Sequence, residues 1–187
     1  MIIIRKANLS DANDIAKMHA DSFIASLQHL VPKSKLLKIN PEGFKNRWGK
    51  RLSDDSHHAY IARNNKSIVG IINLALNSRT TYPEIAHLYI HPDYWRKGIG
   101  KKLMLFAIRL MRRKGVKKVK VWALKTNPKS RAFYESLGAY TTGIERKEIL
   151  ESIPLIEVLY YIDTKIASQS MSKNDDIKIG HYKKLAA

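Results

Sequence analysis

Apolar residues recur along this chain at two spacings, which mark where strands and helices begin and end. Alternating or continuous apolar runs predict strands at residues 2–6, 58–63, 67–77, 118–124, 139–147 and 154–162, with another that begins near Glu84. Apolar stripes at helical spacing follow four capping or helix-starting positions: Ser10, Pro41, Gly98 and Asn127. Strands interspersed with helices in this way predict an α/β protein.

The strand that begins near Glu84 and ends at Pro92 carries or adjoins many of the candidate functional residues. In a regular strand, successive side chains point to opposite faces. Regular alternation places Glu84, Ala86, Leu88 and Ile90 on one face, and Ile85, His87 and Tyr89 on the other. A β-bulge in this strand would break that alternation.

A short basic loop with two glycines, Gly98 and Gly100, connects this strand to the next predicted helix. Glycine lets the backbone approach a ligand, and a helix start offers unpaired N–H groups and a positive dipole end to an anion. Strand, loop and helix together therefore predict the site of a phosphate-bearing cofactor. Two other phosphate loops do not fit, because Trp95 and Leu103 stand where a P-loop and a dinucleotide fingerprint need glycine.

Composition narrows the chemistry further. The 187 residues suffice for one domain with a sizeable core. The chain contains no cysteine, which excludes disulfides, cysteine metal sites and a thiol nucleophile. Neither a signal peptide nor an apolar run of membrane-spanning length is visible, so we expect a cytoplasmic protein with no membrane partner.

The formal charge of +18 at pH 7 is large and unevenly distributed. Eleven lysines and arginines, and no acidic residue, lie between Arg96 and Lys120. Such a run is either a solvated helix face or a field that attracts a polyanion. A phosphate-bearing cofactor and a nucleic acid are both polyanions, and charge alone does not separate them.

Two motifs, at residues 89–103 and 127–139, resemble in order and spacing the GNAT superfamily of acetyl-CoA-dependent N-acetyltransferases. The first, YIHPDYWRKGIGKKL, is similar to the family's Gln/Arg-x-x-Gly-x-Gly/Ala pyrophosphate loop. The second, NPKSRAFYESLGA, is similar to its Asn-x-x-Ala/Ser-x-x-Phe-Tyr-x-x-x-Gly-Phe segment. Trp95, followed by Arg96, stands where the family has Gln or Arg, and Ala139 stands where Phe is more common.

The resemblance covers most of residues 1–163 and implies a single N-acetyltransferase domain there. Its sheet would be mixed, mostly antiparallel and flanked by helices, with the strands at Glu84 and at 118–124 splayed apart to admit coenzyme A. The first helices would wall the acceptor cleft, so three aromatic residues either line it or belong to the core: Phe23, Phe44 and Trp48. Residues 164–187 lose apolar periodicity and predict a flexible tail, whose last four residues look like the start of a vector-encoded linker.

The resemblance also implies how acetyl-CoA is held. Main-chain N–H groups from about Arg96 to Lys101 would bind the pyrophosphate, with added charge from lysines. Main chain from Leu88 to Ile90 would pair with the pantetheine arm, and one N–H there would polarise the thioester oxygen. The candidate cofactor-binding residues are Leu88, Tyr89, Ile90, Trp95, Arg96, Lys97, Gly98, Ile99, Gly100, Lys101, Asn127, Ser130 and Tyr134, with Lys102 as a further charge. No metal is expected.

Two residues are the candidates for proton transfer. Glu84, near the start of the cofactor strand, would accept the proton of the incoming ammonium, directly or through water. His87 and Glu157 are the alternatives for this role, and a carboxylate that only binds the cationic substrate is another reading of Glu84. Tyr134 matches the family's tyrosine that protonates the departing thiolate, although packing alone would also explain a tyrosine there.

These features predict an N-acetyltransferase that moves the acetyl group directly to a primary amine in a ternary complex. The acceptor is a polyamine, a protein N-terminus or lysine, or a small amine. Two alternatives remain: a non-catalytic acyl-CoA-binding regulatory module, and a nucleic-acid-binding protein that uses the basic run between Arg96 and Lys120. A homodimer fits the resemblance, but no stretch of this sequence specifies an interface.

Overall fold

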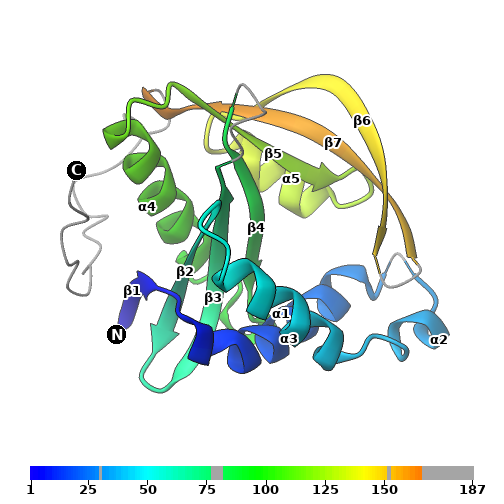
Figure 1. Ribbon diagram of the computed structural model, residues 1–187. Helices are drawn as coiled ribbons and strands as arrows, with labels where there is room; N and C mark the ends of the chain where they lie inside the picture. The colour runs from blue at the N-terminus through cyan, green and yellow to red at the C-terminus, as the bar shows by residue number, and fades with distance from the viewer. Residues whose placement is uncertain (30, 77–81, 151–152, 166–187) are drawn as a thin grey trace.

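A computed structural model of the chain describes residues 1–29, 31–76, 82–150 and 153–165 (Figure 1). Seven strands form one sheet in the order β1-β2-β3-β4-β5-β7-β6. Their bounds are β1 Ile2–Lys6, β2 His57–Asn64, β3 Ser67–Ala75, β4 Glu84–Ile90, β5 Lys118–Leu124, β6 Tyr140–Leu150 and β7 Ile153–Asp163. The predicted mixed, mostly antiparallel sheet is confirmed, because only the β4–β5 pair is parallel.

The parallel pair is also the shortest. β4 and β5 are in register only at Glu84 with Lys120 and at Ile85 with Val121. Beyond these residues β5 pairs along its whole length with β7, while β4 stays with β3. Figure 1 shows the two strands diverging from this contact, so the splay expected between them is present.

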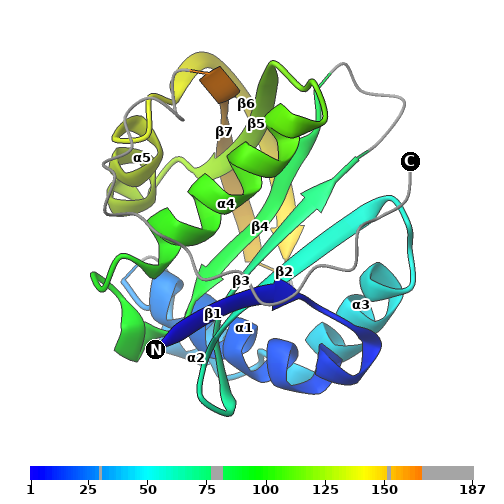
Figure 2. The same ribbon diagram turned by 90° about the vertical axis from the view of Figure 1, so that its left-hand side faces the viewer.

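Helices cover both faces of the sheet. Their bounds are α1 Ala12–Leu27, α2 Lys33–Leu36, α3 Pro41–Leu52, α4 Ile99–Arg113 and α5 Pro128–Glu135, with 3-10 turns η1 Leu9–Asp11 and η2 Pro92–Tyr94. One apolar cluster joins α4 and α5 to the sheet, and a second joins α1 and α3 to the opposite face. Figure 2 looks onto the face that α4 covers. The lysine-rich segment after Pro32 contains the short helix α2.

The aromatic residues of the first helices belong to the core. Phe23, Phe44 and Trp48 are all at most 2% exposed. The Trp48 indole N–H donates a hydrogen bond to His19 Nδ1 at 3.0 Å, which satisfies the indole inside the protein. Of the two interpretations of these aromatic residues, packing is therefore confirmed.

Local capping explains where the helices beside the site begin. The Asn40 side chain accepts a hydrogen bond from the Glu42 N–H, and Pro41 occupies the first turn of α3. Asn127 caps α5 in the same way, by accepting from the Ser130 N–H at 3.0 Å. Asn127 followed by Pro128 was the sequence signal for α5, and Pro41 with the apolar stripe after it was the signal for α3.

A β-bulge at Ala86 interrupts the alternation of β4. Asn73 pairs with His87 and Leu74 with Ile85, which leaves Ala86 as the extra residue. As a result Ile85 packs with the α4 cluster, the same cluster that Leu88 and Ile90 contact.

The opposite face carries His87 and Tyr89, whose rings contact His19 of α1. Glu84, one residue before Ile85, shares this face with His87, and the two line a common pocket. The expectation of regular alternation is therefore wrong upstream of the bulge, because one inserted residue reverses the facing of everything before it.

The C-terminal end of the described chain is anchored to the sheet. Thr164 is 2% exposed, and its hydroxyl donates a hydrogen bond to the Val116 carbonyl at 2.8 Å. The remainder of the predicted tail, from 166 onward, lies outside the described residues. No helix in the described ranges combines the length and the apolar character needed to cross a bilayer.

Candidate active site

The loop between β4 and α4 has a backbone suited to anions. Arg96 and Gly98 both adopt left-handed conformations, with φ of 62° and 77°. Gly98 is the N-cap of α4, and no side chain caps this helix. The first N–H groups of α4 lie at the positive end of a 15-residue helix. This is the arrangement that binds phosphate.

Trp95 anchors the loop to the end of β4. Its indole N–H donates to the Ile90 carbonyl at 2.7 Å, and the Ser22 hydroxyl of α1 donates to the same oxygen at 2.8 Å. The ring is 38% exposed, so one edge faces solvent. Trp95 thus fixes the position of the loop through the backbone, and its direct contact with the cofactor stays a prediction.

The basic side chains predicted to hold phosphate flank this loop. Lys97 Nζ lies 5.0 Å from the centre of the Tyr94 ring, a cation–π contact that keeps the lysine beside η2. Lys101 is exposed on the first turn of α4, whereas the Ile99 side chain is 3% exposed and packs in the core. Ile99 therefore offers only its main chain to a ligand.

The two motifs that carried the resemblance meet in space. A Cβ placed on Gly100 would lie 3.5 Å from Phe133 Cζ of α5 and 3.7 Å from Ile90 Cγ1 of β4. The start of α4, the end of β4 and the middle of α5 are therefore packed together. This contact places Tyr134, the neighbour of Phe133, beside the splayed strands.

Tyr134 is a buried phenol. It is 7% exposed, and its ring lies 5.3 Å from Phe133 and 6.5 Å from Tyr160, centre to centre. Burial raises the pKa of Tyr134, and the nearby Tyr89 and Glu157 raise it further, so the hydroxyl stays protonated at neutral pH. It makes no hydrogen bond to a residue in the described ranges, which leaves its proton available to a bound substrate.

Asn127 and Ser130 bond to each other at the start of α5. The Ser130 hydroxyl donates to the Asn127 carbonyl at 3.1 Å, in addition to the capping bond from the Ser130 N–H. The capping role of Asn127 is therefore present. Contacts of either residue with the cofactor stay predictions.

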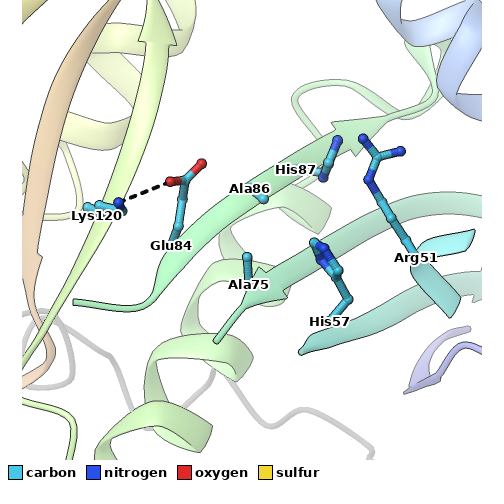
Figure 3. A pocket seen from close by; sticks show the side chains of 7 residues that line it. All are labelled: Arg51, His57, Ala75, Glu84, Ala86, His87 and Lys120. Atoms are coloured by element: carbon cyan, nitrogen blue, oxygen red, sulfur yellow. Dashed lines mark ion pairs between the residues drawn. The ribbon is translucent and has the colours of Figure 1, made fainter. Parts of the chain in front are cut away.

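A pocket of about 280 Å³ lies where β4 and β5 separate (Figure 3). It is lined by residues from α3 and four strands: Arg51, His57, Ala75, Glu84, Ala86, His87 and Lys120. Glu84 Oε2 lies 3.3 Å from Lys120 Nζ, an ion pair that joins the two strands at their last point of pairing. Glu84, the candidate base, thus lies where β4 and β5 begin to separate, and its carboxylate is paired with the ammonium group of Lys120.

Two partly buried imidazoles, His57 and His87, line this pocket. The Asn73 side chain lies 2.9 Å from His57 Nδ1 and 3.4 Å from His87 Nδ1, so it bridges the two rings. Burial lowers the pKa of His87 well below its usual range, and the cationic Arg51 adds to this effect. His87 is therefore neutral at pH 7, and it is positioned by hydrogen bonding within the protein.

Glu157, the other carboxylate alternative, is paired elsewhere. Its Oε2 accepts a hydrogen bond from Arg146 Nε at 2.7 Å. Its charge contributes to the raised pKa of both Tyr89 and Tyr134, which places it on the β7 side of the same region. Glu84 and Glu157 thus approach the splay from different strands.

The basic run between Arg96 and Lys120 is divided among several environments. Lys118 Nζ lies 5.4–5.6 Å from the ring centres of Tyr82, Tyr140 and Tyr161. Lys120 points into the pocket with Glu84, and Arg96 and Lys97 belong to the phosphate loop. These side chains serve separate local contacts rather than one continuous patch.

The splayed sheet and the loop before α4 together are the features expected of a protein that binds a phosphate-bearing cofactor. The sequence profile of the acetyltransferase (GNAT) family matches residues 18–139, so the chain belongs to that family. It is accordingly an acyltransferase, and acetyl-CoA is its acyl donor.

Relatives agree with this placement. The chain is similar to the uncharacterized N-acetyltransferase YuaI of Bacillus subtilis, with 26% identity over 80% of this chain and 86% of that one. It is 31% identical to spermidine N(1)-acetyltransferase of Thermoplasma acidophilum, but over only 38% of this chain and 44% of that protein.

The fold is similar to that of a solved structure, the PaiA N-acetyltransferase from Thermoplasma acidophilum in complex with coenzyme A. The TM-score is 0.68 at 20% identity, covering 87% of this chain and 99% of that one. In the described part of this chain, no three histidine or acidic side chains gather in a way that could hold a metal ion.

Gly98→Ala is expected to weaken acetyl-CoA binding by up to about tenfold, because a left-handed φ costs a residue with a Cβ roughly 1–2 kcal/mol. Nothing lies within 4 Å of the added Cβ, so the effect would come from backbone conformation alone. Titration calorimetry measures the change in Kd. Gly49→Ala on α3, where a Cβ also meets nothing within 4 Å, is the matched control and should leave Kd unchanged. Equal Kd values for both variants would contradict this role of Gly98.

The stability of the protein is expected to decrease as pH falls from about 7 to 5. Burial lowers the pKa of His19 and His87 well below 6.5, the value each has when unfolded. Between the folded and unfolded values the unfolded chain binds more protons, so the free energy of unfolding rises with pH by up to about 1.4 kcal/mol per unit for each histidine.

Urea unfolding at several pH values measures this slope. Partly buried His58, whose pKa is also lowered by burial, adds to it. His87→Gln should make the slope shallower, whereas the same slope in wild type and variant would show that His87 is not responsible.

Proposed function

We propose that this acyltransferase moves the acetyl group of acetyl-CoA to a primary amine by direct attack within a ternary complex. The observation that carries the proposal is that the Glu84 pocket opens at the residues where β4 and β5 stop pairing. The acceptor pocket and the cofactor cleft would thus share one opening. The chain has no cysteine to carry an acyl group between two half-reactions.

The residues of this chain would divide the binding of acetyl-CoA between them. The N–H groups at the start of α4, with Arg96, Lys97 and Lys101, would hold its phosphates. Main chain from Leu88 to Ile90 pairs with β3 on one side and has no partner strand on its β5 side in the described pairing. The pantetheine amides would pair with this free side as an added strand does. When bound, acetyl-CoA supplies the activated acetyl group.

Three proton transfers complete the reaction. Glu84 would first take one proton of the ammonium, directly or through water, and the neutral amine would then bond to the thioester carbon. A main-chain N–H near Leu88 or Ile90 would stabilise charge on the oxygen. As the carbon–sulfur bond breaks, Tyr134 would give its proton to the thiolate, and the second proton that leaves the nitrogen would restore the tyrosine. The Glu84–Lys120 pair supports this role for Glu84, because the carboxylate already binds one ammonium group at 3.3 Å.

Thiol release from acetyl-CoA tests the proposal. The purified protein is mixed with acetyl-CoA and a panel of polyamines, amino acids, N-terminal peptides and lysine peptides. Release that requires an amine and gives the N-acetyl product by mass spectrometry supports transfer. Binding of acetyl-CoA without release by any amine would favour the acyl-CoA-binding module instead.

A further inference from the structure

Arg51 is a cation in the proposed acceptor pocket, and no anionic side chain of the described residues pairs with it. It lies near the end of α3, and its side chain is partly buried and directed into the pocket beside His87 (Figure 3). Its guanidinium lies 5.5 Å from the centre of the Trp48 ring and makes neither an ion pair nor a hydrogen bond to a residue in the described ranges. A buried charge is costly to leave unpaired, so a guanidinium held in this way suits an anionic ligand.

The charge balance of the pocket points the same way. Its lining carries Arg51 and Lys120 against one carboxylate, Glu84, which already pairs with Lys120. Burial lowers the pKa of Arg51, and the charge of Arg47, one turn earlier on α3, lowers it further. Arg47 therefore adds positive potential at this end of the pocket. A ligand with positive charge only would meet repulsion at the Arg51 end.

The phosphates of acetyl-CoA do not explain Arg51. The β4 residues that line the pocket lie between Glu84, where the strand begins, and His87 at its middle, whereas the phosphate loop follows the opposite end of the strand. The four steps from His87 to His91 span roughly 13 Å at the rise of a β-strand. Arg51 lines the same pocket as His87, so it belongs to the acceptor side of the site.

We propose that the acceptor is an amine that also carries a carboxylate, with Arg51 binding the carboxylate and Glu84 receiving the amine. This inference rests on the proposed acetyl transfer and names its substrate class. Figure 3 shows the Glu84–Lys120 pair and Arg51 at opposite ends of the pocket, so the two groups of one small molecule could bind together. An arginine fork suits a carboxylate because it offers two parallel hydrogen bonds.

A polyamine fits this pocket poorly. Spermidine, the substrate in the name of one relative, brings several ammonium groups and no anion. That relative matches only 38% of this chain. One carboxylate would have to bind all of those ammonium groups while two cations repel them. The pocket therefore discriminates by charge against the polyamine class.

Matched acceptor pairs test the proposal. Thiol release is measured at physiological salt with lysine against cadaverine, and with β-alanine against β-alaninamide, which differ mainly in the carboxylate. We expect kcat/KM to be about 10- to 100-fold higher for the carboxylate member, the range of a charged hydrogen bond. Spermidine should be a weaker acceptor than lysine.

Arg51→Gln should remove this preference by raising KM for the carboxylate member alone. KM for acetyl-CoA and the rate with the member that lacks the carboxylate should remain as in the wild type, which a general loss of fold would not produce. Arg51→Lys should restore part of the preference, because it keeps the charge without the fork. Lys50→Gln, the same loss of charge on an exposed neighbour, is the matched control and should change nothing.

Three results separate this inference from the proposed function. Thiol release at equal rates with and without the carboxylate on the acceptor overturns the anion site but leaves the proposed acetyl transfer intact. An Arg51→Gln variant that slows both acceptors of a pair equally has the same meaning. If no amine supports release, calorimetry of the same pairs with the protein–coenzyme A complex decides. Tighter binding of the carboxylate member, lost in Arg51→Gln, supports the site without transfer, whereas equal binding overturns it.

Discussion

Tyr134→Phe is expected to lower kcat for acetyl transfer by about 100-fold or more, the range of a lost general acid. The hydroxyl is buried, its pKa is raised by burial, and it has no hydrogen-bond partner in the described part of the chain. The substitution therefore removes a proton donor and leaves the ring packing against Phe133 and Tyr160. Because the tyrosine is protonated across the working pH range, the loss should not recover at any pH between 6 and 9. Steady-state thiol release measures it.

KM for acetyl-CoA gives the second readout of this variant. It should change by less than about threefold, because an interaction made only as the thiolate leaves affects kcat rather than ground-state binding. Tyr161→Phe on β7 removes a hydroxyl from a partly exposed ring and should keep wild-type kinetics. Full activity of Tyr134→Phe would reduce Tyr134 to a packing residue.

Glu84→Gln is expected to lower kcat/KM by about 100-fold near neutral pH, since a positioned base contributes about 10²–10⁴-fold. The glutamine keeps the shape of the side chain and removes both the base and the partner of Lys120. Activity of the variant should rise with pH, because a larger share of the amine then arrives neutral. A pH–rate profile of kcat/KM from pH 6 to 10 measures both effects.

Glu157→Gln is the matched comparison for Glu84→Gln. Glu157 is also a carboxylate paired with a cation near the splay, through Arg146. If Glu84 is the base, Glu157→Gln should retain most of the activity and the wild-type pH profile. The reverse outcome, with loss in Glu157→Gln and near-normal rates in Glu84→Gln, would assign the base to β7. A Lys120→Met variant separates loss of the base from exposure of an unpaired lysine in the pocket.

The parts of the structure that local chemistry decides were predictable from the sequence. Asn127 and Pro128 start α5 by capping and by a preset φ, and Gly98 takes a left-handed φ before α4. The phosphate loop follows from the same signals, because strand, glycine and helix start are consecutive in the chain. The splay of β4 from β5 followed from the family resemblance carried by the two motifs.

Contacts between distant elements could not be read from local patterns. The Glu84–Lys120 pair depends on the register of two strands that are separated by a whole helix. Arg51 follows the apolar stripe of α3 and looks like a solvated helix residue, yet its side chain enters the pocket because α3 packs against β2 and α1. The facing of Glu84 depends on the extra residue at Ala86, which changes the periodicity without any distinctive residue type.

The bulge at Ala86 divides β4 into two parts, each with its own pairing register to β3. Downstream of it, the main chain from Leu88 onward is held in register with β3 and leads into the phosphate loop. Upstream of it, the pairing register determines whether the side chain of Glu84 or that of Ile85 faces the pocket. Deletion of Ala86 would keep Glu84 on the pocket side, because Ile85 and His87 already pair with consecutive residues of β3. Retaining Ala86 in regular pairing would instead turn Ile85 to the pocket. The bulge thus sets the pocket side of the strand separately from the main chain that leads to the phosphate loop.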